Sequence, residues 1–510
     1  MTLAYSARFA ALQLLVDDAF ISFRYAERLV ETGELTFNAG QRVEGYSNLL
    51  WTLLLAWGNR VGLSPPGLAP ALGYLLGLGT LGLVVVAARR RLDGGVESSL
   101  AVAGLVATQT AWCFWAGAGL ETPLFGLLLL GAWFGATGPS ASTWRGQTIV
   151  GLLAGLLALT RPEGMLLGWL VVPVLLLQGH PRRQWWLAAL VLGTVVGGVT
   201  WWRLSYYGTW LPNPVVAKGT VTLAGIGRGL EYLGEYLRAE FMIVLAALWL
   251  WPPRKPRHLL SLASFVTASV ALVVLAGGDG LYRSRLLAPL TPLLLLAVVP
   301  SLQRANDLGG WHRVGAGVLV LTTLLAPAAQ ERFFRTATLA EVREWEHRWS
   351  LVGAALREQV PPTSRLATNV VGRVSYVSKL PTLDLLGLTD AVIARAPVHG
   401  AGSGYAGHER AAPSYILDQA PDVLYLSVLD GLPEPVFRRP DLLERVVAQG
   451  SLYRYTPLLA SPRFRQQYAP GRLQLADGHA AGVLVRREGP ARALAQPWWS
   501  ATLTPPSPGE

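Results

Sequence analysis

The residues best suited to chemistry stand in "VDDAFISFRYAE", residues 16–27. Asp17 and Asp18 directly follow an apolar opening, and Arg24 comes a short distance later. A carboxylate flanked by arginines should stay ionised, because the cations stabilise its charged form. An ionised carboxylate can act as a general base that takes a proton from a hydroxyl. We therefore expect this segment to be catalytic; an interfacial network of ion pairs is the alternative.

A helix through this segment would give its two acids different neighbours. Asp17 would share a face with Arg24 and Arg28, at i+7 and i+11, whereas Asp18 would share a face with Ser22. We expect ion pairs with the arginines to hold Asp17. Asp18 is then the preferred base, and Asp17 is its positioning partner or a metal ligand.

Other polar side chains gather in five short motifs, "NAGQRVEGYSN", "GLETP", "TRPEG", "YYGTWLPNPVVAKG" and "GGDGLYRSR". The substrate-binding candidates in them are Glu44, Tyr46, Glu121, Arg161, Glu163, Tyr207, Asn213 and Asp279. The candidates for binding a donor phosphate are Lys218, Arg283 and Arg285, together with Arg24 of the first segment. Lysine and arginine suit a phosphate headgroup chemically. Anchors to lipid headgroups and ion pairs at helix ends are the alternatives for single residues.

The composition places the chain in a membrane. Of its 510 residues, 52% are hydrophobic and only 15% are charged, whereas a soluble protein carries nearer a quarter of charged residues. The net charge of +11 is typical of basic cytoplasmic loops and does not argue for a nucleic acid partner. The single cysteine excludes a disulfide framework within the chain. We expect no cleavable signal peptide, because residues 1–16 lack a basic segment and a cleavage site.

The apolar runs predict about ten to eleven transmembrane helices. Ten lie near residues 68–88, 97–116, 120–137, 147–160, 164–178, 184–204, 240–251, 259–276, 286–300 and 313–328. Residues 1–16 are a short candidate for one more span. Residues 49–62 are too interrupted for a span and predict an amphipathic helix near the interface.

Arginine-rich loops alternate with loops that carry the polar motifs. Loops such as 89–97, 179–184 and 252–258 are arginine-rich, which predicts that they are cytoplasmic. The motif-bearing loops, including the first outer loop 17–48, then share the opposite face. Polar groups at membrane depth are costly unless they pair or line a cavity, so five such motifs on one face predict a site there.

The chain divides into two parts by composition. Residues 1–336 form the membrane module, and residues 337–510 contain no span. A helix is expected over 337–360, and "RLATNVVG" and "DVLYLSV" are expected as short buried strands. We expect an extracytoplasmic α/β domain here, with a flexible Pro-rich tail after residue 496.

The motifs together resemble a known family. In order, "DDAFISFRYAERLVETGELTFNAGQRVEGYSNLLWTLLLA", "GLETPLF", "LTRPEG", "YYGTWLPNPVVAK" and "GGDGLYRSRLLAPLTPLL" look like GT-C glycosyltransferases. The segments "LPTLDLLGLTDAVIAR" and "GHERAAPSYILDQAPDVLYL" resemble the outer domain of the terminal β-(1→2) arabinofuranosyltransferases of the cell wall. The last of these segments adds His408 to the substrate-binding candidates. The family has a full span before its paired acids, where this sequence has 16 residues, which leaves open a start upstream of Met1.

This resemblance implies a polytopic α-helical glycosyltransferase in a bacterial inner membrane. It would move a sugar from a polyprenyl-phosphate donor to a glycan or lipid acceptor outside the cytoplasm. The family's central acids fall on Asp17 and Asp18, its lysine on Lys218 and its "GGD" acid on Asp279. Some members use a divalent cation such as Mg²⁺ or Mn²⁺, and these three acids could supply oxygen ligands.

The chemistry of such a reaction agrees with these residues. The leaving group would be a lipid phosphate, and nearby cations would stabilise its developing charge. One base suffices for a single displacement with inversion. A GT-C transferase for mannose or aminoarabinose is the nearest alternative. A transporter or flippase of lipid-linked sugar is the rival from another class, although the sequence shows no internal repeat of the kind many transporters have.

Overall fold

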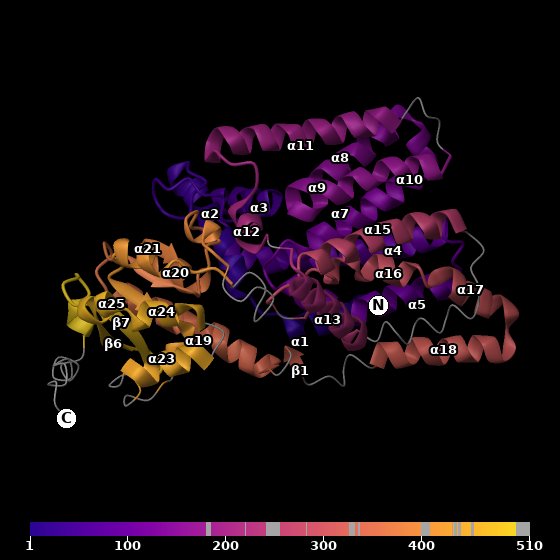
Figure 1. Cartoon of the computed structure of the whole chain (residues 1–510). Helices are drawn as coiled ribbons and strands as arrows, with labels where there is room; N and C mark the ends of the chain where they lie inside the picture. The colour runs from indigo at the N-terminus through magenta and orange to yellow at the C-terminus, as the bar shows by residue number, and fades with distance from the viewer. Residues whose placement is uncertain are drawn as a thin grey trace. The chain divides into compact units, whose positions relative to one another are not determined.

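The computed structural model describes most of the chain (Figure 1). It leaves out residues 180–184, 220, 241–255, 282, 326–331, 335–336, 399–408, 431, 433–435, 437–439, 450–452 and 496–510.

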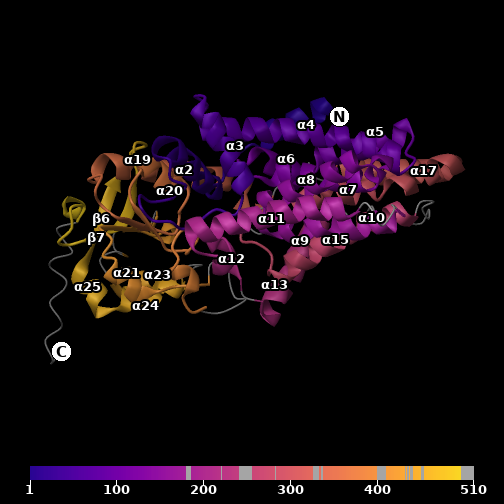
Figure 2. The ribbon, with the colours of Figure 1, turned by 90° about the horizontal axis from the view of Figure 1, so that it is seen from above.

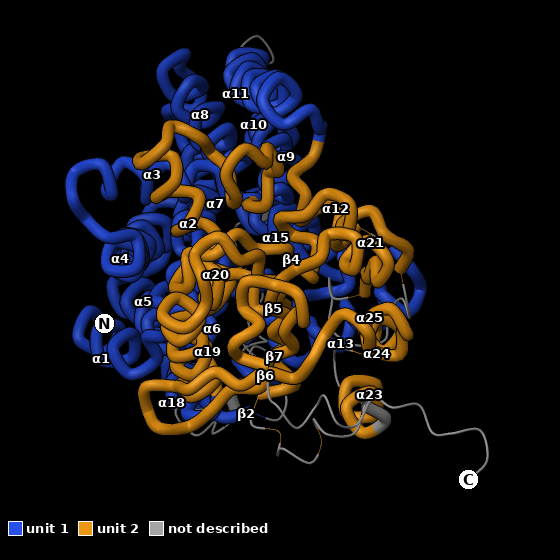
Figure 3. Tube along the Cα trace, turned by 90° about the vertical axis from the view of Figure 1, so that its left-hand side faces the viewer, with its two compact units in different colours: residues 1–15, 47–210, 220–341 blue, residues 16–46, 211–219, 342–510 orange. Residues whose placement is uncertain are grey.

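The chain forms two compact units (Figure 3). Unit 1 comprises Met1–Leu15, Ser47–Trp210 and Thr220–Glu341, and unit 2 comprises Val16–Tyr46, Leu211–Gly219 and Val342–Glu510. Unit 2 therefore includes two segments, 16–46 and 211–219, that the sequence-based boundary at 336/337 assigned to the membrane module as outer loops.

Unit 1 is almost entirely helical. Its helices are α1 (Thr2–Leu12), α3 (Leu49–Arg60), α4 (Pro65–Arg91), α5 (Val96–Thr108), α6 (Thr110–Gly117), α7 (Thr122–Ala136), α8 (Trp144–Thr160), α9 (Pro162–Leu167), α10 (Val171–Leu177), α11 (Trp185–Tyr207), α13 (Leu223–Ala239), α15 (Pro256–Leu275), α16 (Thr291–Leu296), α17 (Val299–Leu308) and α18 (Gly310–Leu325). Short 3₁₀ helices precede α8, α10 and α16, and the strands β1 (Arg332–Phe334) and β2 (Ala337–Thr338) pair antiparallel.

Fewer helices are long enough to cross a membrane than the sequence predicted. Among the described residues, four helices pass by length and composition, namely Pro65–Arg91, Trp185–Tyr207, Arg257–Leu275 and Ala288–Leu308, and α5 with α6 makes a fifth that is bent by 59°. The other predicted spans also lie on helices, except that 240–251 falls almost wholly outside the described residues. Helices such as α7 and α18, of 15 and 16 residues, reach only about 24 Å, less than the ~30 Å hydrocarbon core.

Close helix packing in unit 1 depends on small residues. On α8, Gly151 and Gly155 face Val191 and Val195 of α11, and a Cβ on either glycine would come within 3 Å of them. Small residues four apart let two apolar helices approach closely where lipid supplies no hydrophobic force. Figures 1 and 2 both show α8 beside α11.

Unit 2 is built on a five-stranded sheet in the order β4-β3-β5-β7-β6. The strands are β3 (Leu366–Thr368), β4 (Thr382–Asp384), β5 (Val423–Tyr425), β6 (Tyr468–Gln474) and β7 (Ala480–Arg486). Strand β3 is parallel to β4 and β5, and β7 is antiparallel to β5 and β6. The predicted strands in "RLATNVVG" and "DVLYLSV" are confirmed as β3 and β5.

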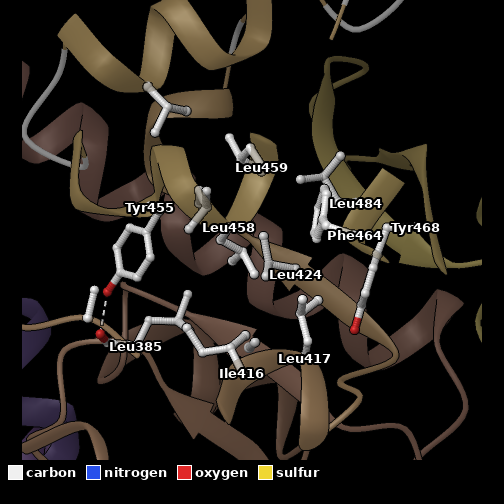
Figure 4. Packing of buried hydrophobic residues seen from close by; sticks show 14 of the residues in the cluster. Leu385, Ile416, Leu417, Leu424, Tyr455, Leu458, Leu459, Phe464, Tyr468 and Leu484 are labelled. Atoms are coloured by element: carbon white, nitrogen blue, oxygen red, sulfur yellow. Dashed lines mark hydrogen bonds between the residues drawn. The ribbon is translucent and has the colours of Figure 1, made fainter. Parts of the chain in front are cut away.

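Helices cover both faces of this sheet. They are α2 (Asp17–Thr32), α12 (Asn213–Lys218), α19 (Leu339–Gln359), which begins in unit 1, α20 (Arg373–Ser378), α21 (Pro413–Asp418), α23 (Pro440–Gln449), α24 (Thr456–Ala460) and α25 (Pro462–Gln467), with short 3₁₀ turns between them. Alternate residues of a strand face opposite sides. Accordingly Leu366 packs in a core with α19, whereas Ala367 packs in a second core with α21 and α24. Figure 4 shows the second core, in which the Tyr455 hydroxyl donates to the main-chain oxygen of Leu385.

Candidate active site

The acidic pair opens α2, within unit 2. Asp17 and Asp18 are the first two residues of this helix, where acids interact favourably with the helix dipole. The helix ends at Gly33, which has φ 74° and so takes the left-handed conformation that suits a glycine. Both acids are half-buried.

Asp17 binds the start of another helix. Its carboxylate oxygens accept the N–H of Arg373 at 2.6 Å and of Gly372 at 3.2 Å, so Asp17 caps α20. A Cβ at Gly372 would lie 1.8 Å from the main-chain oxygen of Asp17, which leaves room only for glycine. The prediction that Arg24 and Arg28 hold Asp17 in ion pairs is therefore wrong. Sequence spacing along α2 could not reveal partners some 355 residues away.

A second acid lies against Asp17. Glu346 of α19 is 1% exposed and accepts the main-chain N–H of Asp17 at 3.0 Å. Its other oxygen lies 2.8 Å from Nε of Arg373, whose guanidinium also stacks over the Phe20 ring at 4.2 Å. The sequence analysis missed Glu346 and Arg373, because neither stands in a motif that suggests chemistry.

The Asp17 and Glu346 carboxyls hold protons more tightly than ordinary acids. Desolvation raises the pKa of Asp17 to about 7 and that of Glu346 to about 8, and the N–H donors and Arg373 only partly oppose it. The neighbouring Asp18 raises the pKa of Asp17 further. The expectation that arginines keep this acid ionised is thus wrong for Asp17.

Arg24 is buried and binds main-chain oxygens. Its guanidinium donates to the carbonyls of Phe37 at 2.9 Å, Ser375 at 2.8 Å and Leu380 at 2.9 Å, and it lies over the Phe37 ring. These contacts tie the first outer loop to α20. They argue against Arg24 as a phosphate ligand.

A turn after β4 gathers the two outer loops of unit 2. The side chain of Asn213 donates to the main-chain oxygens of Gly387, Leu388 and Asp390 at 2.7–3.1 Å. Its own N–H donates to the main-chain oxygen of Glu44 at 2.9 Å. Asn213 therefore joins both loops to this turn, which is a positioning role rather than a substrate contact.

The buried Asp384 organises the turn. Its carboxylate accepts the N–H of Leu386 at 2.7 Å, of Gly387 at 3.1 Å and of Thr389 at 2.6 Å. Burial still raises the pKa of Asp384 to about 6. The segment "LDLLGLTD" was noted only for its family resemblance, and its structural role was not predicted.

The remaining candidates of unit 2 surround these loops. Tyr46 is buried and its ring packs edge-on against Tyr25. Lys218 ends α12 and is half-buried, and the preceding carbonyls of Val216 and Ala217 accept from Arg410. His408 lies outside the described residues.

Unit 1 holds a separate ionic cluster around Arg161. Its Nε lies 2.7 Å from Glu163 and 3.7 Å from Glu121. Glu121 also accepts from the side-chain amide of Asn48 at 2.7 Å. Arg161 is 4% exposed and its Nη1 has no hydrogen-bond partner among the described residues. Buried guanidinium donors are normally satisfied, so this atom is suited to a ligand.

The "GGDGLYRSR" loop forms a second ionic group in unit 1. Asp279 lies 2.7 Å from Nε of Arg285. Arg283 has φ 42° and is 8% exposed, and its main-chain oxygen accepts from the indole of Trp115 at 2.9 Å. Tyr207, at the end of α11, is also buried in this unit and contacts Trp202 and Tyr206.

The sequence left open whether a metal binds, with Asp17, Asp18 and Asp279 as the acids that could supply ligands. Over the part of the chain that the structure describes, there is no group of three His, Cys, Asp or Glu side chains that could hold a metal ion. Both carboxylate oxygens of Asp17 already accept N–H groups. This arrangement does not fit a metal held by Asp17, and metal dependence stays an untested expectation.

The chain shares its fold with solved membrane proteins. Two crystal structures of ArnT from Cupriavidus metallidurans have the same fold. The one bound to undecaprenyl phosphate matches with a TM-score of 0.55 at 12% identity, over 75% of this chain and 84% of that one. The apo structure matches with a TM-score of 0.54 at 13% identity, over 97% of this chain and 98% of that one. The chain thus has the fold of the GT-C membrane glycosyltransferases.

Sequence comparison is consistent with this fold. A terminal β-(1→2)-arabinofuranosyltransferase of Corynebacterium glutamicum is 28% identical over 382 residues, 65% of this chain and 53% of that protein. A protein of the same name in Mycobacterium tuberculosis is 28% identical over 338 residues, which cover 56% of this chain and 53% of that protein. The chain spans about half the length of these curated relatives. Residues 338–472 also match a domain family of unknown function, DUF8728.

Proposed function

We propose that this protein is a membrane glycosyltransferase that moves a sugar from a polyprenyl-phosphate donor to a glycan acceptor outside the cytoplasm. The observation that carries the proposal is the paired acids at the start of α2 in a chain with a GT-C fold. The similarity to arabinofuranosyltransferases makes a furanose pentose the sugar to test first. The ArnT structure with undecaprenyl phosphate supports a polyprenyl-phosphate carrier.

Asp18 is the general base in this proposal. The Asp17 carboxylate is committed to capping α20, which leaves Asp17 to position its neighbour. Asp18 takes the proton of the acceptor hydroxyl while that oxygen attacks the anomeric carbon. The bond from this carbon to the phosphate oxygen breaks, the polyprenyl phosphate leaves, and the configuration inverts.

Cationic side chains stabilise the phosphate as it leaves. The candidate in the same unit as Asp18 is Lys218. Arg283 and Arg285 belong to unit 1 and stay candidates from the sequence alone. Cations aimed at an oxygen on which charge develops lower the barrier to its departure.

Incubating the purified protein with a radiolabelled polyprenyl-phosphate arabinofuranose and an arabinofuranosyl oligosaccharide tests the proposal. We expect free polyprenyl phosphate and an extended oligosaccharide in equal amounts. A parallel reaction with a mannosyl donor distinguishes the pentose from the nearest alternative. Movement of intact donor across a vesicle membrane, with no extended product from either donor, would show a transporter instead.

A further inference from the structure

An open groove of about 260 Å³ lies within unit 2, outside the acidic cluster. The turn at 38–41, the turn after β4 and the start of α21 border it. Its volume is near the lower end of small-molecule sites, which begin at roughly 300 Å³. The groove is therefore suited to one or two units of a larger, partly solvated molecule.

The lining offers both donors and acceptors of hydrogen bonds. Asn38, Gln41 and Gln419 contribute amides, Tyr415 a hydroxyl and Asp390 a carboxylate. The Tyr415 hydroxyl donates to Asp390 at 3.0 Å, which fixes the ring at the groove. Pro381, Leu383 and Ala39 add apolar surface.

The four cations that line the groove have their donors engaged, and two of them are paired with carboxylates. Arg28 lies 3.5 Å from Glu34, and Lys379 lies 2.6 Å from Glu27. Arg24 binds carbonyls, and Arg365 donates to the Gln419 side chain at 2.8 Å. An anion would need unopposed donors and would be repelled by Asp390. A neutral polyhydroxyl ligand, in contrast, could hydrogen-bond the donors and acceptors of the groove and pack on its apolar surface at the same time.

Lys379 has a backbone conformation that is unfavourable for a lysine. It ends α20 with φ 59°, the left-handed conformation that glycine or asparagine usually takes. It is one of only three lysines among the 43 basic residues. Its ammonium reaches over the Tyr376 ring at 4.2 Å and borders the groove.

We propose that this groove is a binding subsite for the acceptor glycan, which takes sugar units at some distance from the hydroxyl that reacts. This inference rests on the proposed transferase function and specifies how the acceptor is held. Lys379 and the amides of Gln41 and Gln419 hydrogen-bond the sugar hydroxyls, and Asp390 accepts from them.

Titration of the full chain in detergent with a neutral arabinofuranosyl oligosaccharide tests the subsite. Lys379→Gly should weaken its affinity by about tenfold, while the Tm stays equal or rises because glycine relieves the left-handed backbone. Gln41→Ala, in an exposed turn, should weaken binding without a loss of Tm. Arg463→Ala removes another exposed ion pair of unit 2, with Asp418, and should leave affinity unchanged.

Equal affinity in Lys379→Gly and Arg463→Ala would overturn the subsite, as would competition by inorganic phosphate at constant ionic strength. Transfer assays separate this failure from that of the proposed function. We expect Lys379→Gly to raise KM for long acceptors and leave transfer to a single-sugar acceptor unchanged. If the wild type binds the oligosaccharide but transfers nothing, the subsite holds and the transferase proposal fails.

Discussion

At the scale of single residues, the two adjacent acids have different environments. The chain places Asp17 where two N–H groups and Glu346 enclose it, and Asp18 one residue further along α2. The sequence predicted that Asp17 would be held, and the structure agrees, whereas the assignment of Asp18 as the base stays a prediction. The sequence could not predict what holds Asp17, since Glu346 and Gly372 come together only in the fold.

Replacing each acid by asparagine separates their roles. Asp18→Asn keeps the shape but cannot accept a proton, so we expect turnover to fall by at least ~10²-fold with donor affinity nearly intact. Asp17→Asn should lose less turnover, and it should lose about 1 kcal/mol of stability because an amide presents an N–H to one of the capping donors. Single-turnover transfer, donor titration and thermal unfolding measure these effects. Near wild-type turnover in both variants would show that the catalytic base is elsewhere.

The acidic cluster also predicts how stability depends on pH. Raised pKa values for Asp17 and Glu346, about 7 and about 8, mean that the folded protein keeps protons that the unfolded chain releases above pH ~4. The free energy of unfolding should therefore fall as the pH rises from about 5 to about 8. A pKa that differs by one between the folded and unfolded chain corresponds to about 1.4 kcal/mol, so we expect a loss of at least about 1 kcal/mol.

Thermal unfolding of the detergent-solubilised protein across this range measures the effect. Asp17→Asn removes one of the titrating groups, which also include Asp384, and should make the profile less steep below pH ~7. A profile that rises with pH in the wild type would contradict the assignment.

At the scale of elements, the turn of residues 384–390 joins segments that are far apart in the chain. Asp384 holds the turn from within, and Asn213 holds it from the second outer loop. Gly45 of the first loop fits closely against it, since a Cβ there would lie 2.5 Å from Thr389. Both loops thus depend on one short turn for their position.

Asn213→Ala should loosen this junction. It removes an amide whose two hydrogens serve three main-chain oxygens. At about 1 kcal/mol net for each hydrogen, we expect a loss of about 2 kcal/mol in unit 2. Thermal unfolding, with proteolysis of the 211–219 loop as a local readout, measures it. Ser414→Ala, at an exposed position of α21, serves as the control. Unchanged unfolding and proteolysis in Asn213→Ala would show that the junction does not depend on this side chain.

Periodicity and local composition predicted the positions of helices and strands well, but they did not predict which elements contact one another. The apolar run before Arg89–Arg91 predicted α4, and the apolar strands β3 and β5 were recognised by their flanking turns. The bend between α5 and α6 was missed, because both halves are apolar and a hydropathy run does not show a break at Gln109. The capping of α20 by Asp17 joins segments far apart in sequence, which no local pattern reports.

At the scale of the whole molecule, we expect the arginine-rich loops to be cytoplasmic and unit 2 to be extracytoplasmic, because basic loops are retained inside. Cys113 is the only cysteine and is buried, so new cysteines can be labelled selectively. Ser414→Cys should react with a membrane-impermeant maleimide on intact cells, whereas Arg90→Cys should react only after lysis. Labelling of Arg90→Cys from outside would reverse the topology and remove the argument for a shared outer face.

The division of unit 2 among three stretches of chain has an evolutionary consequence. Residues 16–46 and 211–219 belong with 342–510, although membrane helices separate them in sequence. Recombination that exchanged only the C-terminal part between two relatives would separate the turn at 384–390 from the loops that fit it. Domain shuffling at this boundary should therefore be selected against, and substitutions at Asn213, Gly45 and Thr389 should co-vary across descendants of a common ancestor.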